Sequence, residues 1–549
     1  MLVVGGCASE RDAAPPGPPQ AAIASAHPVA TAAGFEVLTG GGNAFDAAIA
    51  VSATLAVVEP YSSGIGGGGF WLLHRAQDGM QRMVDGRETA PGAAHRKMYQ
   101  DANGEVVPKL SVDGALAAGI PGEPAALEHI AQRYGRLPLA RSLAPAIRAA
   151  REGFEVTEQY RRMAEFRLEA LRASPAAAAV FLSNGEVPAI GHRIRQPDLA
   201  ATLETIAREG ADGFYRGAVA RMLVEGSRAA GGIWTLDDLA GYQVKERAPL
   251  TGEFGGLRIV SAPPPSSGGV ALLTILNIIS GYSLEKLNLA TRTHLTVEAM
   301  RRAYRDRAEY LGDMDFVQVP LRRLTSRDYA AGLRATIRLD RASASKELRP
   351  VAPQPAGQHT THLSILDTEG NRVAATLSIN YPFGACFVPP GTGVLLNDEM
   401  DDFSAKPGVA NVYGLVGAEA NAIAPRKRML SSMSPTFVES EQGVGIIGTP
   451  GGSRIITMVL HGILALHAGA DAQQIVAKKR YHHQYLPDAI QFEPGAFDAQ
   501  LQAELELLGH QLQPLDSDYG NMQTVIWDRG ANKVSAASDP RGEGLAEVR

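Results

Sequence analysis

The segment from residue 43 to residue 58 restricts the fold most, because it is apolar on nearly every face of a helix. It opens with Asn43, a residue type that commonly caps helices, and contains neither glycine nor proline. A helix that is hydrophobic all round must be buried. The 549 residues can enclose such a helix, since 45% are hydrophobic and only 20% are charged, as in globular proteins with a sizeable core.

The charge and cysteine content exclude several classes of protein. Lys and Arg total 52 against 58 Asp and Glu, which gives a net charge of −6. A nucleic-acid partner is therefore not expected, because binding to phosphate needs a basic face. Two cysteines, Cys7 and Cys386, cannot build a disulfide framework, and no Cys/His spacing indicates structural zinc. No run of 18 apolar residues indicates a membrane helix.

Residues 1–20 form a start unlike the rest of the chain. The letters VGGC, ending at Cys7, resemble the end of a bacterial lipoprotein signal, in which a cysteine accepts lipid. The charged start and the long apolar stretch of a complete signal are missing, so either the upstream part is absent or the likeness is accidental. Residues 13–19, rich in proline, have the composition of a tether.

Several other segments have clear local patterns. Apolar periodicity predicts helices at residues 138–151, 198–208, 270–279 and 293–310, and a strand at 70–73. Residues 64–69 satisfy G-x-G-x-x-G, but a helix precedes them and a strand follows, the reverse of a dinucleotide site. His482 and His483 are adjacent and lack accompanying carboxylates, which favours hydrogen bonding over metal binding.

The region that follows the proline-rich residues 349–358 carries the strongest functional signal. Residues 360–366 alternate polar and apolar side chains, residues 367–371 have turn chemistry, and residues 373–380 resume an extended pattern, which predicts a hairpin. The two threonines at its start are also typical of ordinary strands. If the chain is cut before Thr360, however, that residue carries both a hydroxyl nucleophile and an α-amine able to serve as its base.

Three further segments fit acyl-transfer chemistry. Residues 448–453 (GTPGGS) join an apolar strand to the predicted helix 454–466, so their N–H groups can stabilise an oxyanion. Residues 397–403 gather acidic side chains that suit an ammonium group, or that form a solvated loop. Residues 430–436 gather small hydroxyls, as many turns do.

Taken together, these motifs resemble the γ-glutamyltransferase (γ-glutamyltranspeptidase) family of N-terminal nucleophile hydrolases. The likeness lies in the segments beginning at Thr360, Leu395, Ser431 and Gly448, and upstream in GNAFDAAIAVSATLAVVEP, DGRETAP and PPPSSGG. It covers essentially the whole chain beyond the first 20 or so residues.

The resemblance implies an α+β fold, a four-layer αββα sandwich built from two subunits of one self-cleaved precursor. The implied cleavage falls between His359 and Thr360, which divides one structural domain into a large subunit, residues 21–359, and a small subunit, residues 360–549. The implied activity is attack of Thr360 on the γ-glutamyl amide of glutathione or a related compound. Water or an amino acid or dipeptide acceptor then resolves the ester, without cofactor or metal. The implied location is the bacterial periplasm or envelope, with a possible lipid anchor at Cys7.

The resemblance also assigns roles to residues that match its motifs. Thr360 is the implied nucleophile, and Ser378 positions it. The implied oxyanion donors are Gly451 and Gly452. The residues implied in binding the α-carboxylate are Arg87, Ser431 and Ser432; those implied in binding the α-ammonium are Asn380, Glu399 and Asp402. Tyr413 matches the lid over the pocket.

The chain departs from the family pattern at two positions. His359 precedes the scissile bond where other members often carry another residue, which puts the rate of cleavage in doubt. Ser378 stands where the family commonly has threonine but keeps the hydroxyl. Two alternatives remain open: a cephalosporin or glutaryl-type acylase of the same fold, and an uncleaved, inactive homologue that acts as a binding protein.

Overall fold

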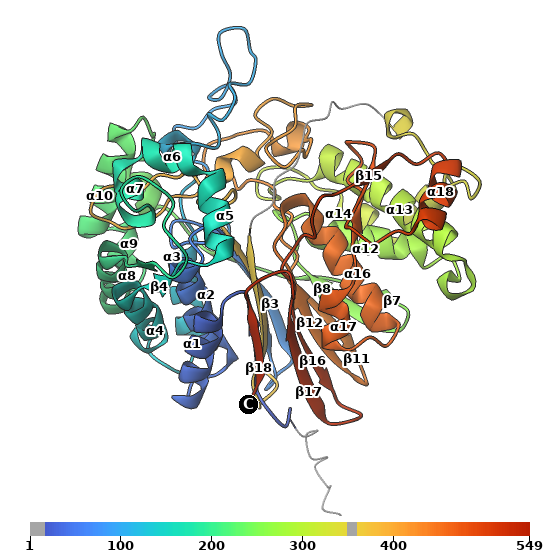
Figure 1. The fold of residues 1–549 in the computed structure, drawn as a ribbon, viewed down its shortest axis with the longest axis horizontal. Coiled ribbons are helices and arrows are strands. Elements are labelled where there is room, and N and C mark those ends of the chain that lie inside the picture. Colours follow the sequence, from blue (N-terminus) through green and yellow to red (C-terminus); the bar gives the residue numbers. More distant parts are fainter. Residues whose placement is uncertain (1–16, 349–359) are drawn as a thin grey trace, which may run out of the picture.

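Two antiparallel β-sheets face each other at the centre of the protein, with helices on both outer sides (Figure 1). The structure is a computed structural model and describes residues 17–348 and 360–549. The first sheet has seven strands in the order β18-β1-β9-β10-β2-β3-β6. Their bounds are β1 Ala22–Ser25, β2 Gly68–Arg75, β3 Met80–Gly86, β6 Lys245–Arg247, β9 Thr361–Leu366, β10 Arg372–Ser378 and β18 Leu545–Val548.

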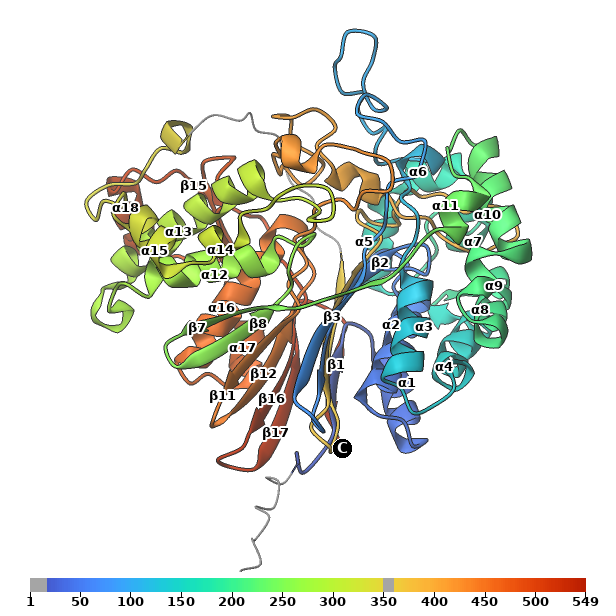
Figure 2. The ribbon, with the colours of Figure 1, turned by 180° about the vertical axis from the view of Figure 1, so that it is seen from behind.

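The second sheet has six strands in the order β17-β16-β12-β11-β8-β7. Their bounds are β7 Leu250–Phe254, β8 Leu257–Ser261, β11 Thr436–Ser440, β12 Gly443–Gly448, β16 Gln523–Asp528 and β17 Lys533–Ser538. The chain passes from the first sheet to the second between β6 and β7, and Figure 2 shows this crossing from behind. The mixed helix-and-sheet class predicted from the sequence is confirmed.

The apolar segment singled out in the sequence is helix α2 (Ala44–Val58), and all 15 of its residues are buried. Asn43 caps it by accepting from the N–H groups of Phe45 and Asp46, while the Asp46 carboxylate accepts from the Asn43 N–H. The helix packs on the outer face of the first sheet, beside α1 (Pro28–Thr39) and α4 (Leu139–Glu152). The prediction of a buried, asparagine-capped helix is confirmed.

Other helices cover the outer face of the second sheet. They are α12 (Gly268–Ile279), α13 (Leu289–Tyr310), α16 (Ile455–His467) and α17 (Ala472–Ala477). The predicted helices 138–151, 198–208, 270–279 and 293–310 are all present, with ends that differ by at most four residues, and the second of them is α8 (Pro197–Glu209). The G-x-G-x-x-G segment, residues 64–69, follows α2 and runs into β2, which confirms that it joins a helix to a strand.

Side chains of the first sheet alternate between two hydrophobic cores, one on each of its faces. Trp71 and Leu73 of β2 pack toward α2, whereas Phe70 and Leu72 pack toward the second sheet. Successive side chains of a strand point to opposite faces, so an almost continuous apolar run suits a strand that is covered on both sides.

Each sheet combines strands from before and after residue 360. In the first sheet β9 lies between β1 and β10, and in the second sheet β11 pairs with β8. The two parts of the chain therefore share the same hydrophobic cores. Cys7, the proline-rich residues 349–358 and His359 lie outside the described residues.

Candidate active site

The β9–β10 hairpin places Thr360 at the start of a central strand. The two strands pair antiparallel, and the Asp367 carboxylate closes the turn by accepting from the N–H groups of Glu369 and Asn371, at 3.0 and 2.9 Å. Leu363 packs toward α2, whereas the Ser364 hydroxyl donates to backbone oxygens of the second sheet. Alternation therefore directs the Thr360 side chain toward the second sheet. The residue is 5% exposed.

The glycine-rich loop lies opposite, after β12. Gly451 and Gly452 have φ angles of +139° and +55°, which L side chains rarely adopt. A Cβ atom on Gly452 would lie 2.6 Å from Cδ1 of Tyr413, so a larger residue cannot fit. The loop continues into a short 3₁₀ turn (Gly452–Arg454) and then α16, as the sequence predicted for an oxyanion-binding segment.

One small pocket contains ten of the predicted site residues. Its volume is about 20 Å³, close to the space of a single water molecule. The predicted residues that line it are Arg87, Thr360, Ser378, Asn380, Glu399, Asp402, Tyr413, Ser431, Ser432 and Gly452. Gly451 instead lines a neighbouring cavity, which Thr360 also lines. The structure thus gathers residues that span 366 positions of the sequence.

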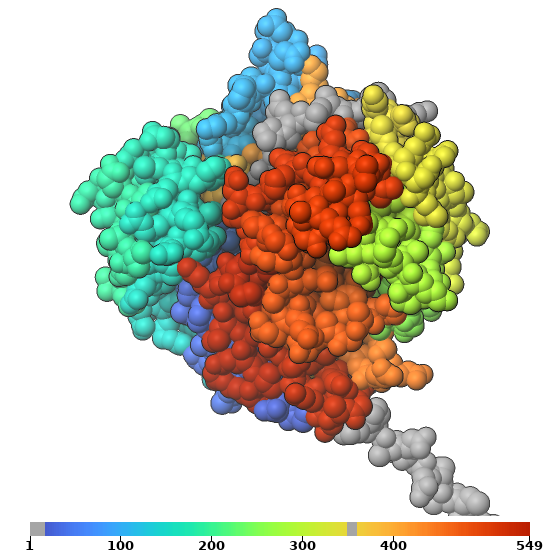
Figure 3. Space-filling model, turned by 45° about the vertical axis from the view of Figure 1, so that its right-hand side comes forward, coloured from blue at the N-terminus to red at the C-terminus, as the bar shows by residue number. Residues whose placement is uncertain are grey.

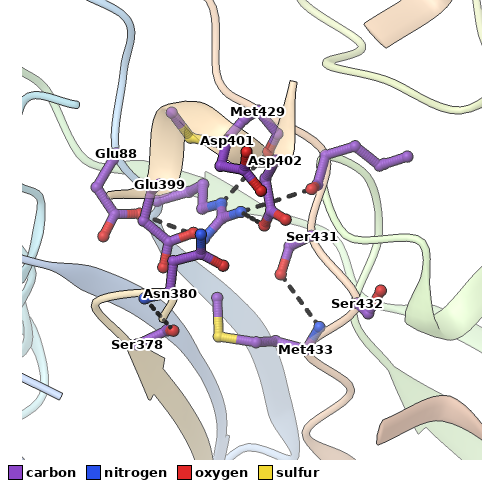
Figure 4. Close-up of polar contacts among 12 residues, drawn as sticks. Glu88, Ser378, Asn380, Glu399, Asp401, Asp402, Met429, Ser431, Ser432 and Met433 are labelled. Atoms are coloured by element: carbon purple, nitrogen blue, oxygen red, sulfur yellow. Dashed lines mark hydrogen bonds and ion pairs between the residues drawn. The ribbon is translucent and has the colours of Figure 1, made fainter. Parts of the chain in front are cut away.

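Arg87 forms the centre of the pocket's charge network. Figure 4 shows its partners Glu399 and Asp402 close together in the pocket. Its Nη1 contacts Glu399 Oε2 and its Nη2 contacts Asp402 Oδ2, both at 2.5 Å. Its Nε donates to the backbone oxygen of Met429 at 3.3 Å. Arg87 and Glu399 are each 1% exposed, so this ion pair is buried. A zwitterionic ligand can replace these contacts, because its carboxylate matches the guanidinium and its ammonium matches the two carboxylates.

Burial changes the protonation of these groups. It raises the pKa of Glu399 to about 7, opposed by Arg87 and increased by Asp402. Burial also raises the pKa of Glu88, which lies next to Arg87 and near Glu399. The Arg87 pKa stays above its ordinary value, since the surrounding carboxylates outweigh the effect of burial. Arg87 is therefore a fixed positive charge, whereas Glu399 can gain or lose a proton near neutral pH.

Asn380 links the hairpin to Tyr413. Its backbone has φ +74°, and its N–H donates to the Ser378 hydroxyl at 2.8 Å. Its carbonyl oxygen accepts from the Tyr413 hydroxyl at 2.5 Å, and Tyr413 is only 3% exposed. Tyr413 thus lines the pocket between the hairpin on one side and Gly452 on the other.

Arg307 also contacts the pocket, through Ser432, and was not predicted from the sequence. Arg307 lies on α13, and its Nη2 donates to the Ser432 hydroxyl at 3.2 Å while its Nε donates to the Ser267 hydroxyl at 3.0 Å. Ser431 is held separately, because its hydroxyl accepts from the Met433 N–H at 3.1 Å. Nothing in the periodicity of α13 marks Arg307, since the helix carries several other buried charged residues.

Glu59 is a second residue that was missed. It follows α2, is 4% exposed, and its Oε2 accepts from the Thr361 hydroxyl at 2.7 Å. Burial raises its pKa from 4.5 to about 8; the Thr361 hydrogen bond opposes this effect and the charge of Glu543 adds to it. At neutral pH the Glu59 carboxyl is therefore mostly protonated, directly beside the predicted nucleophile.

This raised pKa predicts a pH-dependent stability. The folded state holds the Glu59 proton more tightly than the unfolded state, so stability falls as pH rises from about 4.5 to about 8. The test uses a Thr360→Ala background, which keeps the chain in one piece. In it, Glu59→Gln should abolish this fall in the free energy of unfolding, which amounts to up to about 5 kcal/mol. Thermal unfolding midpoints of the two proteins, measured from pH 5 to 9, should therefore diverge progressively up to about pH 8 and then keep a constant difference. Parallel profiles would show that Glu59 ionises normally.

The adjacent histidines form hydrogen bonds, as predicted. His482 contacts the Thr457 hydroxyl at 2.8 Å and His483 contacts Asp488 at 3.2 Å. Among residues 17–348 and 360–549, no group of three or more His, Cys, Asp and Glu side chains is arranged to hold a metal ion. In the same ranges no helix has the length and apolarity needed to cross a bilayer.

Comparison with known proteins gives consistent matches. The profile of the γ-glutamyltranspeptidase family matches residues 30–548. The glutathione hydrolase proenzyme of Pseudomonas sp. (strain A14) is 44% identical over 97% of this chain and 95% of its own. Among solved structures, a cephalosporin acylase from Bacillus halodurans has a TM-score of 0.85 at 27% identity, covering 100% of this chain and 99% of that one. The γ-glutamyltranspeptidase of Helicobacter pylori has a TM-score of 0.58 at 40% identity, covering 59% and 94%.

Proposed function

The chain belongs to the γ-glutamyltranspeptidase family, and from this premise we propose how its residues carry out the reaction. It is a glutathione hydrolase and γ-glutamyltransferase. The observation that carries the proposal is the pocket in which Thr360 meets Arg87, Glu399 and Asp402. An alcohol nucleophile beside a paired guanidinium and carboxylates suits an amide whose acyl group ends in an amino-acid zwitterion.

The first proposed step is self-cleavage before Thr360. The Thr360 hydroxyl attacks the carbonyl carbon of His359, the peptide C–N bond breaks, and the resulting ester is hydrolysed by water. The α-amine freed at Thr360 then becomes available as a base. The proenzyme name of the Pseudomonas relative supports such a maturation.

In the proposed catalytic cycle the same hydroxyl attacks the γ-carbonyl carbon of the substrate. Its proton passes to the α-amine, and the oxyanion faces the N–H groups of Gly451 and Gly452. The amine product leaves with that proton, and water or an acceptor amine attacks the ester. Ser378 positions Thr360 in this scheme.

The proposed substrate contacts use the charge network described above. Arg87 holds the α-carboxylate with help from Ser431 and Ser432. The α-ammonium is held by Asn380, Glu399 and Asp402. Tyr413 covers the bound γ-glutamyl group. The direct pairing of Arg87 with Glu399 and Asp402 opens when the substrate enters.

We further propose that the two facing sheets and their outer helices form the αββα sandwich of N-terminal nucleophile hydrolases. The large subunit then ends at His359 and the small one starts at Thr360, and the two remain one structural unit. Support comes from the interleaving of strands from both sides of residue 360 in each sheet. The proposed acceptors are amino acids or dipeptides, and the proposed location is the periplasm or envelope; a lipid on Cys7 stays a prediction outside the described residues.

The acylase alternative has one observation in its favour, the structural likeness to the Bacillus halodurans enzyme. The test compares γ-glutamyl-p-nitroanilide with glutaryl-p-nitroanilide, which lacks only the α-ammonium. We expect kcat/KM to be at least about 100-fold higher for the γ-glutamyl compound, because the glutaryl compound brings no ammonium group to replace the Arg87 contacts of Glu399 and Asp402 that its carboxylate takes up. Equal rates would favour an acylase, and an uncut, inactive chain would favour a binding protein.

A further inference from the structure

Arg307 is a buried cation that pairs with no carboxylate in the described part of the chain. It is 4% exposed, and its hydrogen bonds go to two hydroxyl groups, those of Ser267 and Ser432. Within the same part of the chain, every other buried arginine except Arg454 forms an ion pair with a carboxylate. Arg454 instead lies over an aromatic ring and donates to a side-chain amide oxygen. A buried, unpaired charge is costly, so a ligand that brings a negative charge close to Arg307 would remove this cost.

The helix that carries Arg307 holds this side chain against the pocket. α13 lies on the outer face of the second sheet, and α18 (Ala499–Leu507) covers its first half from outside. Figure 3 shows the red-orange segment that includes α18 lying against the yellow-green residues around α13. Tyr304, three residues before Arg307, donates through its hydroxyl to the backbone oxygen of Ser453, next to the glycine-rich loop. The same face of α13 therefore reaches both that loop and Ser432.

The Ser432 hydroxyl connects the charge of Arg307 to the pocket. It accepts from Nη2 of Arg307 at 3.2 Å, and Ser432 lines the pocket together with Thr360 and Arg87. A hydroxyl that accepts one hydrogen bond still has its own proton to donate. With Arg307 as donor on one side, Ser432 can therefore donate to an anion in the pocket, where the α-carboxylate is proposed to bind.

Arg307 also supports the neighbouring serine, Ser431. Its Nε donates to the Ser267 hydroxyl at 3.0 Å, and that hydroxyl donates to the backbone oxygen of Ser431 at 2.7 Å. The N–H of Ser267 donates to the same oxygen at 2.8 Å. The two serines that are proposed to assist Arg87 are thus both linked to one guanidinium.

The charges around the pocket balance only when Arg307 is included. Arg87 contributes one positive charge, and Glu399 and Asp402, when ionised, contribute two negative ones. Asp402 also acts on Arg307: burial lowers the pKa of Arg307, and the charge of Asp402 raises it. With Arg307 the total is zero, which suits a zwitterion that is itself neutral. Without Arg307 a net negative charge would oppose the α-carboxylate.

We propose that Arg307 is a positioning residue for the substrate α-carboxylate and acts through Ser432 and through its charge. Arg87 contacts the carboxylate directly, whereas Arg307 makes Ser432 a donor and cancels the remaining negative charge around the pocket. The inference rests on the proposed function and adds to it a determinant of specificity: donors with an α-carboxylate are preferred over donors with a neutral group in its place.

The test compares two donors that differ only in that charge, γ-glutamyl-p-nitroanilide and its α-carboxamide analogue. In the wild type we expect kcat/KM to be at least about 100-fold higher for the carboxylate. Arg307→Gln should raise the KM for γ-glutamyl-p-nitroanilide about tenfold and leave the KM for the carboxamide unchanged, so the preference falls about tenfold. Arg307→Lys keeps the charge and should keep most of the preference.

A double-mutant cycle tests the route through Ser432. Ser432→Ala should itself raise the KM for γ-glutamyl-p-nitroanilide about tenfold, because it removes a hydrogen bond to a charged group. In that background Arg307→Gln should add little, since the hydroxyl that it acts through is gone. If Arg307 only supports the fold, the two effects should instead multiply to about 100-fold.

Arg305→Gln is the matched control, since Arg305 lies on the same helix, is partly exposed and pairs with Asp306. It should have the KM of the wild type. Arg307→Gln should also cleave itself normally, because the precursor's own peptide bond needs no α-carboxylate site. Its thermal unfolding midpoint should not fall, since the substitution removes a buried charge that has no carboxylate partner in the described part of the chain.

Equal KM increases for both donors, or independent effects of Arg307 and Ser432, would overturn this proposal while turnover by the wild type still supports the proposed function. If Arg307→Gln does not fold, Arg307→Lys decides, and loss of the carboxylate preference in that variant would overturn the proposal. A wild type that turns over no γ-glutamyl amide would overturn the proposed function and this inference together.

Discussion

Replacing Thr360 by alanine is expected to leave a single 58.0 kDa chain that neither cleaves itself nor turns over γ-glutamyl amides. The hydroxyl of Thr360 is the proposed nucleophile in both self-cleavage and turnover. A water molecule cannot replace it, because both reactions pass through an ester of that hydroxyl. The loss in kcat should be at least about 10³-fold. A denaturing gel and intact mass would follow cleavage, while p-nitroaniline release would follow turnover in the same samples.

Thr360→Ser is the matched control for this experiment. It keeps the hydroxyl and, after cleavage, the α-amine, and it removes only a methyl group from a nearly buried position. We expect two fragments and measurable turnover, at lower rates than in the wild type. If the alanine variant still yields two fragments meeting at residues 359 and 360, the N-terminal nucleophile assignment is wrong.

Arg87→Lys is expected to reduce kcat/KM for γ-glutamyl-p-nitroanilide about 100-fold or more, mainly through KM. The substitution keeps the positive charge between Glu399 and Asp402, so the two carboxylates stay compensated. It removes the planar fork that can bind a carboxylate through two parallel hydrogen bonds, and lysine does not replace that geometry.

Two further measurements separate loss of binding from misfolding. Self-cleavage of Arg87→Lys should continue, because the precursor's own peptide bond needs no α-carboxylate site. Arg82→Lys, at an exposed position of β3, the strand that ends one residue before Arg87, should behave as the wild type. An unchanged KM in Arg87→Lys would show that another group binds the substrate carboxylate.

Much of the local structure and the position of the nucleophile follow from the sequence. The apolar run and its Asn43 cap determine α2, and the alternation after Thr360 determines a hairpin with that residue at its start. The glycines at 451 and 452 indicate the backbone loop. Periodicity, capping and turn chemistry act over a few residues, which is why one sequence is enough to identify them. The remaining site residues could be named only through the family resemblance.

What the tertiary structure decided is how distant residues combine. Arg87 meets Glu399 across 312 positions, and Arg307 meets Ser432 across 125. Local patterns carry no information about such pairs, because they form only when the two sheets and their helices pack. The same packing buries Glu59 beside Thr361 and leaves separate spaces on the two sides of Thr360. The sequence by itself determined that the Thr360 hydroxyl can attack. The fold decided which groups surround that hydroxyl, because burial and long-range contacts set the protonation of those groups and the space open to a substrate.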